Sequence, residues 1–302
     1  MVKFNRSDLT RIYSALIVPF NEDESVNYDA LRDLVEMELR SGVEGFYVCG
    51  SSGEGLLLSV EERCAVTDCV VSQTAGRVPV IAHCGTIRTR DAITLAKAAR
   101  SSGCKAVSMI PPYYYHFSMD EICSYYEDVM AAVPDLPMIL YNIPQFTGIE
   151  FSKQNASRLL TNPNIIGVKH TSNNLYSLER MATSFPEKVL INGFDEQFLG
   201  ALSMGAQATI GTTVNMFAPL FKAIRELYRK GDMENALIIQ QDLNRRVEEL
   251  VSVGIFPATK YACTLLGVDC GSCRKPFGTL TEEQKELVKE TVLRPYPLGI
   301  AQ

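Results

Sequence analysis

Short apolar runs alternate with longer amphipathic stretches over about the first 230 residues, and this alternation restricts the possible folds more than any other feature. The apolar runs predict eight buried strands, at Tyr13–Pro19, Gly45–Cys49, Val78–Ala82, Ala106–Ile110, Pro137–Tyr141, Ile165–Lys169, Val189–Asn192 and Ala208–Gly211. The stretches between and after them predict helices, over Tyr28–Ser41, Val60–Thr74, Thr89–Ser102, Met119–Val133, Ser152–Leu160, Leu175–Phe185, Glu196–Met204 and Phe217–Lys230. Continuous apolar strands separated by helices indicate a parallel sheet that is covered on both faces. Eight such units are the number in a (β/α)8 TIM barrel, so this α/β fold is the predicted one.

Residues at the predicted helix ends agree with these units. Ser59 precedes a helix with Glu61 and Glu62 in its first turn, where acidic residues are favoured. Glycines follow three other helical patterns, where a left-handed residue is favoured, at positions Gly42, Gly103 and Gly205. The alternative, a doubly wound open sheet, would place a glycine-rich phosphate loop after its first strand. Residues 19–22 read Pro-Phe-Asn-Glu instead.

The alternation stops after Gly231. Three further helices are predicted without intervening strands, over Met233–Val253, Phe256–Leu266 and Thr281–Leu293. We therefore expect residues 1–230 to form the catalytic barrel and residues 231–302 a helical extension packed beside it. With 302 residues, of which 46% are hydrophobic, the chain is large enough to bury a core of this size.

Composition excludes several classes of partner. The net charge is −6 and no Lys/Arg blocks occur, which argues against nucleic acid or an anionic membrane surface. The apolar stretch Tyr13–Phe20 is better interpreted as a strand than as a signal peptide, and no run reaches transmembrane length. Nine cysteines without a disulfide pattern indicate reduced thiols in a cytoplasmic protein. Cys270 and Cys273 form a C-x-x-C, but the lack of a second ligand pair argues against zinc.

Lys169 is the strongest single candidate for a functional residue. It ends the apolar run Ile165–Lys169, and a charged side chain in a buried strand costs free energy. Burial disfavours the ammonium form of a lysine, and the free amine can attack a ketone to form a Schiff base. The alternative is a lysine that merely leaves the strand into solvent. The other strand ends decide between the two interpretations.

In a (β/α)8 barrel the active site lies at the C-terminal ends of the strands. Six of the predicted strand ends carry polar groups: Gly50-Ser51-Ser52-Gly53-Glu54, Pro111-Pro112-Tyr113-Tyr114-Tyr115, Tyr141-Asn142-Ile143-Pro144, Lys169 with Thr171, Asn192-Gly193-Phe194-Asp195-Glu196, and Gly211-Thr212-Thr213. The glycines would let backbone N–H groups approach a small anion such as a carboxylate. Tyr141 could move protons beside the lysine nitrogen.

Each of these segments also has a simpler explanation. Gly-Ser-Ser-Gly is a common turn, a run of tyrosines can serve packing, and Asp195 and Glu196 could be helix N-terminal acids. The three histidines, His83, His116 and His170, are too few and too far apart in sequence to predict a metal site. Only the joint placement of the polar segments at one end of the barrel favours a functional site.

Three of these segments resemble motifs of a known family, the Schiff-base aldolases and lyases that include dihydrodipicolinate synthase and N-acetylneuraminate lyase. Gly50-Ser51-Ser52-Gly53-Glu54 is similar to the family's G-[ST]-[ST]-G-E loop, which holds the carboxylate of pyruvate. Tyr141-Asn142-Ile143-Pro144 is similar to its Y-N-[IV]-P strand, and Gly167-Val168-Lys169 to its Schiff-base strand. The resemblance covers essentially the whole chain. It implies a class I aldolase that uses neither a cofactor nor a metal.

Within this family the sialic acid branch is the most similar. Gly167-Val168-Lys169-His170-Thr171-Ser172 is similar to its G-V-K-x-T-S, and Asn192-Gly193-Phe194-Asp195-Glu196 to its N-G-[YF]-D-E. Dihydrodipicolinate synthases have an arginine two residues after Y-N-x-P that holds a carboxylate of the second substrate, and Phe146 stands there. Ser52 replaces a common threonine and Thr212 a common serine, which leaves the fine substrate preference open.

The resemblance implies reversible cleavage of N-acetylneuraminate to N-acetylmannosamine and pyruvate. Lys169 would form an imine with the C2 ketone, and backbone amides of Ser51 and Ser52 would hold the carboxylate. Tyr141 would carry protons, with Ser51 and Tyr114 as relay partners. The family's relay tyrosine comes from a neighbouring subunit, so Tyr114 implies a dimer or a homotetramer. The hydroxylated tail of the substrate would be bound by Thr171, Gly193, Asp195, Glu196 and Thr212.

Two other functions are open alternatives. Another pyruvate aldolase of the family, acting on a keto-deoxy sugar acid or resembling dihydrodipicolinate synthase, would use the same lysine and tyrosine. A non-catalytic sensor of sialate or pyruvate could use the same barrel. A sensor, however, would not need Lys169, Tyr141 and the glycine-containing loop together.

Overall fold

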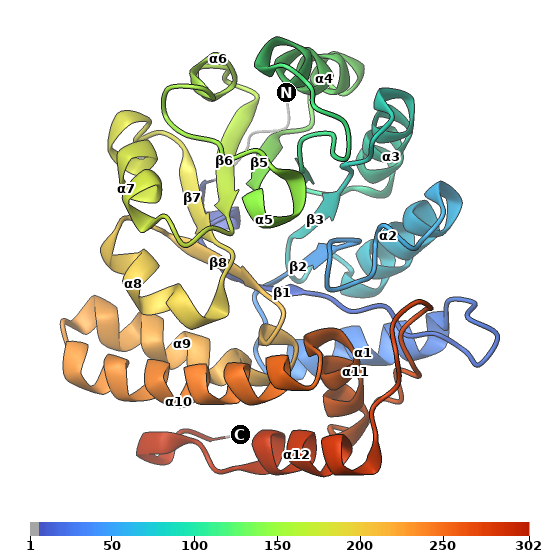
Figure 1. The fold of residues 1–302 in the computed structure, drawn as a ribbon, viewed down its shortest axis with the longest axis vertical. Helices are drawn as coiled ribbons and strands as arrows, with labels where there is room; N and C mark the ends of the chain where they lie inside the picture. Colours follow the sequence, from blue (N-terminus) through green and yellow to red (C-terminus); the bar gives the residue numbers. More distant parts are fainter. Residues whose placement is uncertain (1–5, 302) are drawn as a thin grey trace.

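The chain folds around a closed barrel of parallel strands. A computed structural model of the protein describes residues 6–301, and within them eight strands pair in sequence order, with the last closing onto the first (Figure 1). The strands are β1 (Ile12–Ala15), β2 (Gly45–Val48), β3 (Val80–His83), β4 (Ala106–Met109), β5 (Met138–Asn142), β6 (Ile165–His170), β7 (Val189–Asn192) and β8 (Ala208–Gly211). The predicted (β/α)8 TIM barrel is confirmed.

Helices surround the barrel, and several begin and end as predicted. They are α1 (Tyr28–Arg40), α2 (Val60–Thr74), α3 (Thr89–Ser102), α4 (Met119–Ala132), α5 (Pro144–Thr147), α6 (Ser157–Leu160), α7 (Leu175–Ser184), α8 (Phe198–Ser203) and α9 (Val214–Lys230), with 3₁₀ turns η1 (Arg6–Asp8) and η2 (Asp195–Gln197). Ser59 caps α2: its hydroxyl accepts from the Glu62 N–H (3.2 Å), while Glu62 Oε2 accepts from the Ser59 N–H (2.8 Å). Gly103 ends α3 at φ 97°, a conformation that glycine adopts at little cost.

The first strand is shorter than predicted, because β1 ends at Ala15 and not at Pro19. Beyond it a side chain takes over the backbone hydrogen bonds. Asn215 Oδ1 accepts from the Ile17 N–H (3.2 Å), and Asn215 Nδ2 donates to the Ala15 carbonyl (3.0 Å). Pro19 has no N–H to offer a neighbouring strand. The apolar run therefore continues past the point where the sheet ends.

The helix predicted over Ser152–Leu160 is wrong in its first half, since α6 begins only at Ser157. Asn155 Oδ1 accepts from the Ser152 N–H (2.8 Å), and Ser152 Oγ accepts from the Asn155 N–H (3.3 Å). This reciprocal pair has the arrangement of a capping box and holds a turn, but the chain becomes regularly helical only at Ser157. The predicted helix Glu196–Met204 is likewise divided, into η2 and α8.

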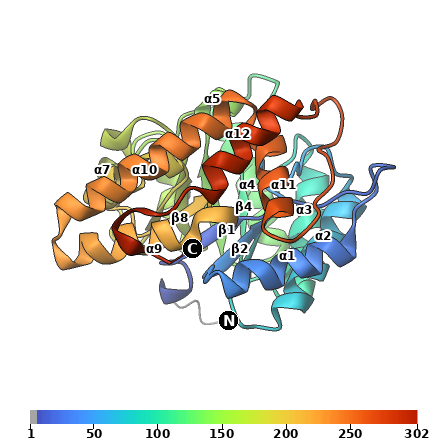
Figure 2. The same cartoon turned by 90° about the horizontal axis from the view of Figure 1, so that it is seen from below.

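The C-terminal helices are present as predicted. They are α10 (Met233–Ser252), α11 (Ile255–Leu265) and α12 (Glu282–Leu293), followed by the 3₁₀ turn η3 (Pro297–Gly299). They pack together beside α9 on one side of the barrel (Figures 1 and 2). Leu243, Cys263 and Val292 belong to the same core as the barrel helices. The division into residues 1–230 and 231–302 stays a prediction, and residues 1–5 and 302 lie outside the described residues.

The cysteines of the described part of the chain are all free thiols, and seven of the nine are buried. Burial raises the pKa of Cys273 to about 12, so its reactive thiolate form is scarce at neutral pH. None of the helices within residues 6–301 is long and apolar enough to cross a membrane.

Glu38 of α1 makes the stability of the fold depend on pH. It is fully buried and faces the Ser14 side chain. Burial raises the pKa of this carboxyl well above its usual value of 4.5. The folded state therefore holds a proton that the unfolded state releases, and stability falls as pH rises from 4.5 towards the raised pKa.

We expect Glu38→Gln to remove this dependence. Relative to the variant, the wild type should lose up to about 1.4 kcal/mol of unfolding free energy per pH unit in that range. Urea unfolding at several pH values between 5 and 8 measures the difference. Glu36→Gln on the same helix is the control, because hydrogen bonding to Arg77 lowers the pKa of Glu36 to about 2, and Glu36 stays charged throughout. A constant difference between Glu38→Gln and wild type would contradict the prediction.

Candidate active site

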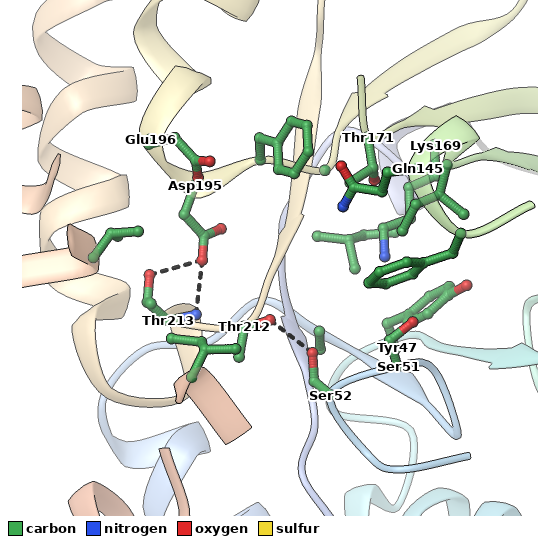
Figure 3. A pocket seen from close by; sticks show the side chains of 18 of the residues that line it. Tyr47, Ser51, Ser52, Gln145, Lys169, Thr171, Asp195, Glu196, Thr212 and Thr213 are labelled. Carbon is green, nitrogen blue, oxygen red and sulfur yellow. Dashed lines mark hydrogen bonds between the residues drawn. The ribbon is translucent and has the colours of Figure 1, made fainter. Parts of the chain in front are cut away.

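A cavity of about 320 Å³ opens at the C-terminal ends of the strands. Nine of the ten predicted site residues line it: Ser51, Ser52, Tyr141, Lys169, Thr171, Gly193, Asp195, Glu196 and Thr212. Figure 3 shows Lys169, Tyr47 and Ser51 on one side of this cavity and Asp195 and Glu196 on the other. Its volume is in the range of small-molecule binding sites.

Lys169 points into the barrel because β6 contains one extra residue. Met138 of β5 pairs with Ile165, but the next residue of β5 pairs with Gly167, so Ile166 is bulged. Ile166 packs in the cluster inside the barrel, whereas Val168 packs in the outer core. Side chains of a regular strand alternate between the two faces, so without the bulge Lys169 would face the helices. The bulge turns its amine towards the cavity.

The Lys169 amine lies between two tyrosine rings. Its Nζ is 4.0 Å from the ring centre of Tyr141 and 4.4 Å from that of Tyr47, and the side chain is only 4% exposed. The two rings meet edge to face at 6.1 Å, and the Tyr47 hydroxyl donates to Ser108 Oγ (3.2 Å). Ring faces attract cations, most strongly where water is excluded. Two aromatic ring faces therefore enclose this nitrogen.

The Gly50–Glu54 loop is bounded by two non-glycine residues in left-handed conformation, Cys49 (φ 57°) and Glu54 (φ 52°). The loop lies close to the backbone just after β1, because a Cβ on Gly53 would come within 2.8 Å of the Leu16 carbonyl oxygen. Ser52 Oγ lies 2.7 Å from Thr212 Oγ1, which joins the loop to the end of β8 (Figure 3). The predicted anion-binding loop is therefore tightly held.

Asp195 is buried and has one oxygen bound and the other unbound. Its Oδ2 accepts from both the N–H and the hydroxyl of Thr213, each at 2.8 Å (Figure 3). Its Oδ1 is buried without a hydrogen-bond partner among residues 6–301. Burial is the main cause that raises the pKa of this carboxyl to about 6. Glu196 beside it is exposed and lines the cavity.

Tyr114 is the predicted site residue that lies outside this cavity. Its side chain is 82% exposed, and its backbone is left-handed with φ 76°. The ring meets that of Tyr115 edge to face at 5.1 Å. The predicted role of Tyr114 in the site of a neighbouring subunit stays a prediction.

Sequence reasoning missed two parts of the cavity. Tyr47 was interpreted as an ordinary residue of an apolar strand, although a buried tyrosine hydroxyl needs a hydrogen-bond partner and so marks a special position. Four apolar residues of the C-terminal helices also form one wall: Val247, Val251, Ile255 and Phe256. No motif in the sequence indicates that α10 and α11 reach the mouth of the barrel.

Two of the histidines have structural hydrogen bonds. His170 Nδ1 lies 3.1 Å from Asn142 Nδ2, and its Nε2 lies 3.1 Å from the Asn174 carbonyl. His83 Nδ1 lies 3.2 Å from the Cys49 carbonyl. Burial lowers the pKa of both rings, which are therefore neutral at pH 7. Among residues 6–301 no three His, Cys, Asp or Glu side chains are grouped so that they could hold a metal ion.

Comparison with known proteins agrees with this geometry. The model of the dihydrodipicolinate synthetase family matches residues 8–294. The chain belongs to this family. It is 42% identical to the N-acetylneuraminate lyase of Rhizobium meliloti over 284 residues, which cover 94% of both proteins.

Solved structures of the family have the same fold. The crystal structure of CdNal from Clostridium difficile in complex with mannosamine is 34% identical, with a TM-score of 0.91 over 93% of this chain and 97% of the other. That of N-acetylneuraminate lyase from Fusobacterium nucleatum is 37% identical, with a TM-score of 0.90 over 94% and 98%.

Gly193 packs so closely against Thr171 that there is no room for a side chain. A Cβ at this position would overlap Thr171 Oγ1, whose hydroxyl is buried. We expect Gly193→Ala to lower the unfolding free energy by about 1–3 kcal/mol. The control is Gly200→Ala in α8, where the nearest atom to the new methyl is Leu175 Cδ1 at 3.4 Å. Thermal unfolding compares the two, and equal stability of both variants would contradict the prediction.

Proposed function

We propose that the protein is an N-acetylneuraminate lyase, which cleaves N-acetylneuraminate to N-acetylmannosamine and pyruvate through an imine on Lys169. The observation that carries this proposal is the buried Lys169 amine between the rings of Tyr47 and Tyr141. It lies in one cavity with the Gly50–Glu54 loop and two carboxylates. The identity to N-acetylneuraminate lyases over more than nine-tenths of the chain supports the choice of substrate.

The reaction begins when the Lys169 amine attacks the C2 ketone of the open-chain sugar acid and water leaves. The resulting protonated imine withdraws electrons from the C3–C4 bond. The Tyr141 hydroxyl gives its proton to the hydroxide that leaves as water when the imine forms. As the C3–C4 bond breaks, its electron pair forms an enamine, and the Tyr141 phenolate takes the proton of the C4 hydroxyl while the aldehyde forms. Protonation of the enamine at C3 and hydrolysis of the imine release pyruvate. The ring faces of Tyr47 and Tyr141 stabilise the cationic imine.

The two ends of the cavity bind different parts of the substrate. Backbone amides of Ser51 and Ser52 hold the carboxylate. The exposed carboxylate of Glu196 accepts hydrogen bonds from the hydroxylated tail, with further polar contacts from Asp195, Thr171, Gly193 and Thr212. Phe146 lines the cavity and cannot bind the second carboxylate that a dihydrodipicolinate synthase requires.

Proton relay extends to a second copy of the chain. Ser51 and Tyr141 both line the cavity, whereas Tyr114 does not line it and is exposed. In the proposed assembly Tyr114 enters the cavity of the adjacent subunit and completes the relay. A dimer is then the smallest active unit, and a dimer of dimers is the proposed homotetramer.

We expect the purified protein to release pyruvate from N-acetylneuraminate and to be labelled irreversibly by pyruvate and borohydride. Lys169→Arg keeps the charge but has no amine that can form an imine, so release and labelling should both be lost. Mass spectrometry of the labelled peptide locates the adduct. If pyruvate labels the protein but pyruvate is released only from another keto-deoxy sugar acid, the protein is a different aldolase of the family. Wild-type protein that pyruvate does not label would contradict the imine mechanism.

Asp195 should make sugar-acid binding depend on pH. Below its pKa of about 6 the carboxyl gains a proton and loses an acceptor for the tail hydroxyls. We expect KM for N-acetylneuraminate to rise about tenfold between pH 7.5 and pH 5. Asp195→Asn can keep its oxygen towards Thr213, so at pH 7.5 it should resemble the wild type at pH 5. Pyruvate lacks the tail and is the control ligand, and a constant KM in the wild type would exclude this role.

A further inference from the structure

Glu54, the last residue of the Gly50–Glu54 loop, forms a buried ion pair with the C-terminal extension. Its Oε1 lies 2.9 Å from the Nζ of Lys260 in α11, and the side chains of both residues are almost completely buried. Its Oε2 accepts a hydrogen bond from the Arg274 backbone N–H (2.8 Å). Two segments more than 200 positions away in sequence therefore hold one carboxylate of the loop.

Lys260 and Arg274, the two partners of Glu54, are themselves fixed by further contacts. Lys260 Nζ donates to the Ser272 carbonyl (2.9 Å) and lies 3.8 Å from the centre of the Phe20 ring. The Arg274 guanidinium pairs with Glu62 of α2 and donates to the Glu24 carbonyl. A buried ion pair contributes little net stability, because desolvation offsets most of the attraction. Its burial at this loop therefore calls for another explanation.

The conformation of the loop supplies that explanation. Cys49 and Glu54 are both left-handed, a conformation that costs free energy in residues other than glycine and persists only where surrounding contacts enforce it. At Cys49 the contact is its carbonyl with His83 Nδ1 (3.2 Å). At Glu54 it is the ion pair. Ser51 and Ser52 lie between these two fixed ends.

We propose that the Glu54–Lys260 pair is a positioning device that aims the backbone amides of Ser51 and Ser52 at the substrate carboxylate. This inference rests on the proposed function, in which these amides hold the carboxylate. Glu54 and Lys260 are positioning residues, since neither lines the cavity. The C-terminal extension thus takes part in recognition of the α-keto acid, at the opposite end of the substrate from Asp195 and Glu196.

The test compares two ketones that form imines with the same lysine. Pyruvate carries a carboxylate, whereas hydroxyacetone does not. Borohydride labelling over a range of concentrations gives the half-saturating concentration of each. In Glu54→Gln and in Lys260→Met we expect the value for pyruvate to rise about tenfold and that for hydroxyacetone to stay within about twofold. Labelling of the wild type by pyruvate is checked first, so failure of the imine mechanism is recognised separately.

Two further variants exclude a general loss of stability. Glu44→Gln removes an ion pair with the buried Arg225 (2.6 Å) at the N-terminal end of β2, remote from the loop. This variant should leave the half-saturating concentrations of both ketones unchanged. The double variant Glu54→Gln/Lys260→Met leaves no unpaired buried charge and should recover stability without recovering pyruvate affinity. If Glu54→Gln does not fold, Lys260→Met and the double variant decide the question. The proposal is overturned if the half-saturating concentration of pyruvate rises no more in Glu54→Gln and Lys260→Met than in Glu44→Gln. It is also overturned if the values for pyruvate and hydroxyacetone rise equally.

Discussion

The extra residue in β6 is the constraint on which the rest of the site depends. Because Ile166 is bulged, both Ile166 near the start of the strand and Lys169 near its end point into the barrel. The amine of Lys169 then meets the rings of Tyr47 and Tyr141, which come from β2 and β5. Bulges next to active sites commonly re-aim one side chain in this way.

The cavity separates charges in a way that suits imine chemistry. The lysine end offers aromatic faces, which stabilise a cation in a site that excludes water. The carboxylates stand at the other side, where Asp195 binds Thr213 with one oxygen and leaves the other unbound. A carboxylate beside the amine would instead form a stable ion pair with its ammonium form and suppress the nucleophile. In the proposed reaction, the separation of these two ends serves both reactivity and recognition.

Sequence alone predicted the barrel, the order of its units and most of the cavity, because these follow from periodicity and from polar residues placed at strand ends. It failed where side chains act on distant backbone. Asn215 ends β1 across about 200 positions. The bulge at Ile166 was also hidden, since a run of apolar residues looks the same with or without an extra residue. Tyr47 and the wall from α10 and α11 depend on tertiary packing, which no local pattern encodes.

The apolar wall formed by Val247, Val251, Ile255 and Phe256 comes from helices that carry none of the reacting groups. In the proposed lyase, variation of this wall would change the aldehyde accepted in the synthetic direction and leave the reacting groups unchanged. Lys260 lies only four residues beyond Phe256 on α11, on a part of the helix that holds the Gly50–Glu54 loop. Substitutions in α11 that alter the cavity wall must therefore preserve the Lys260–Glu54 contact of the same helix.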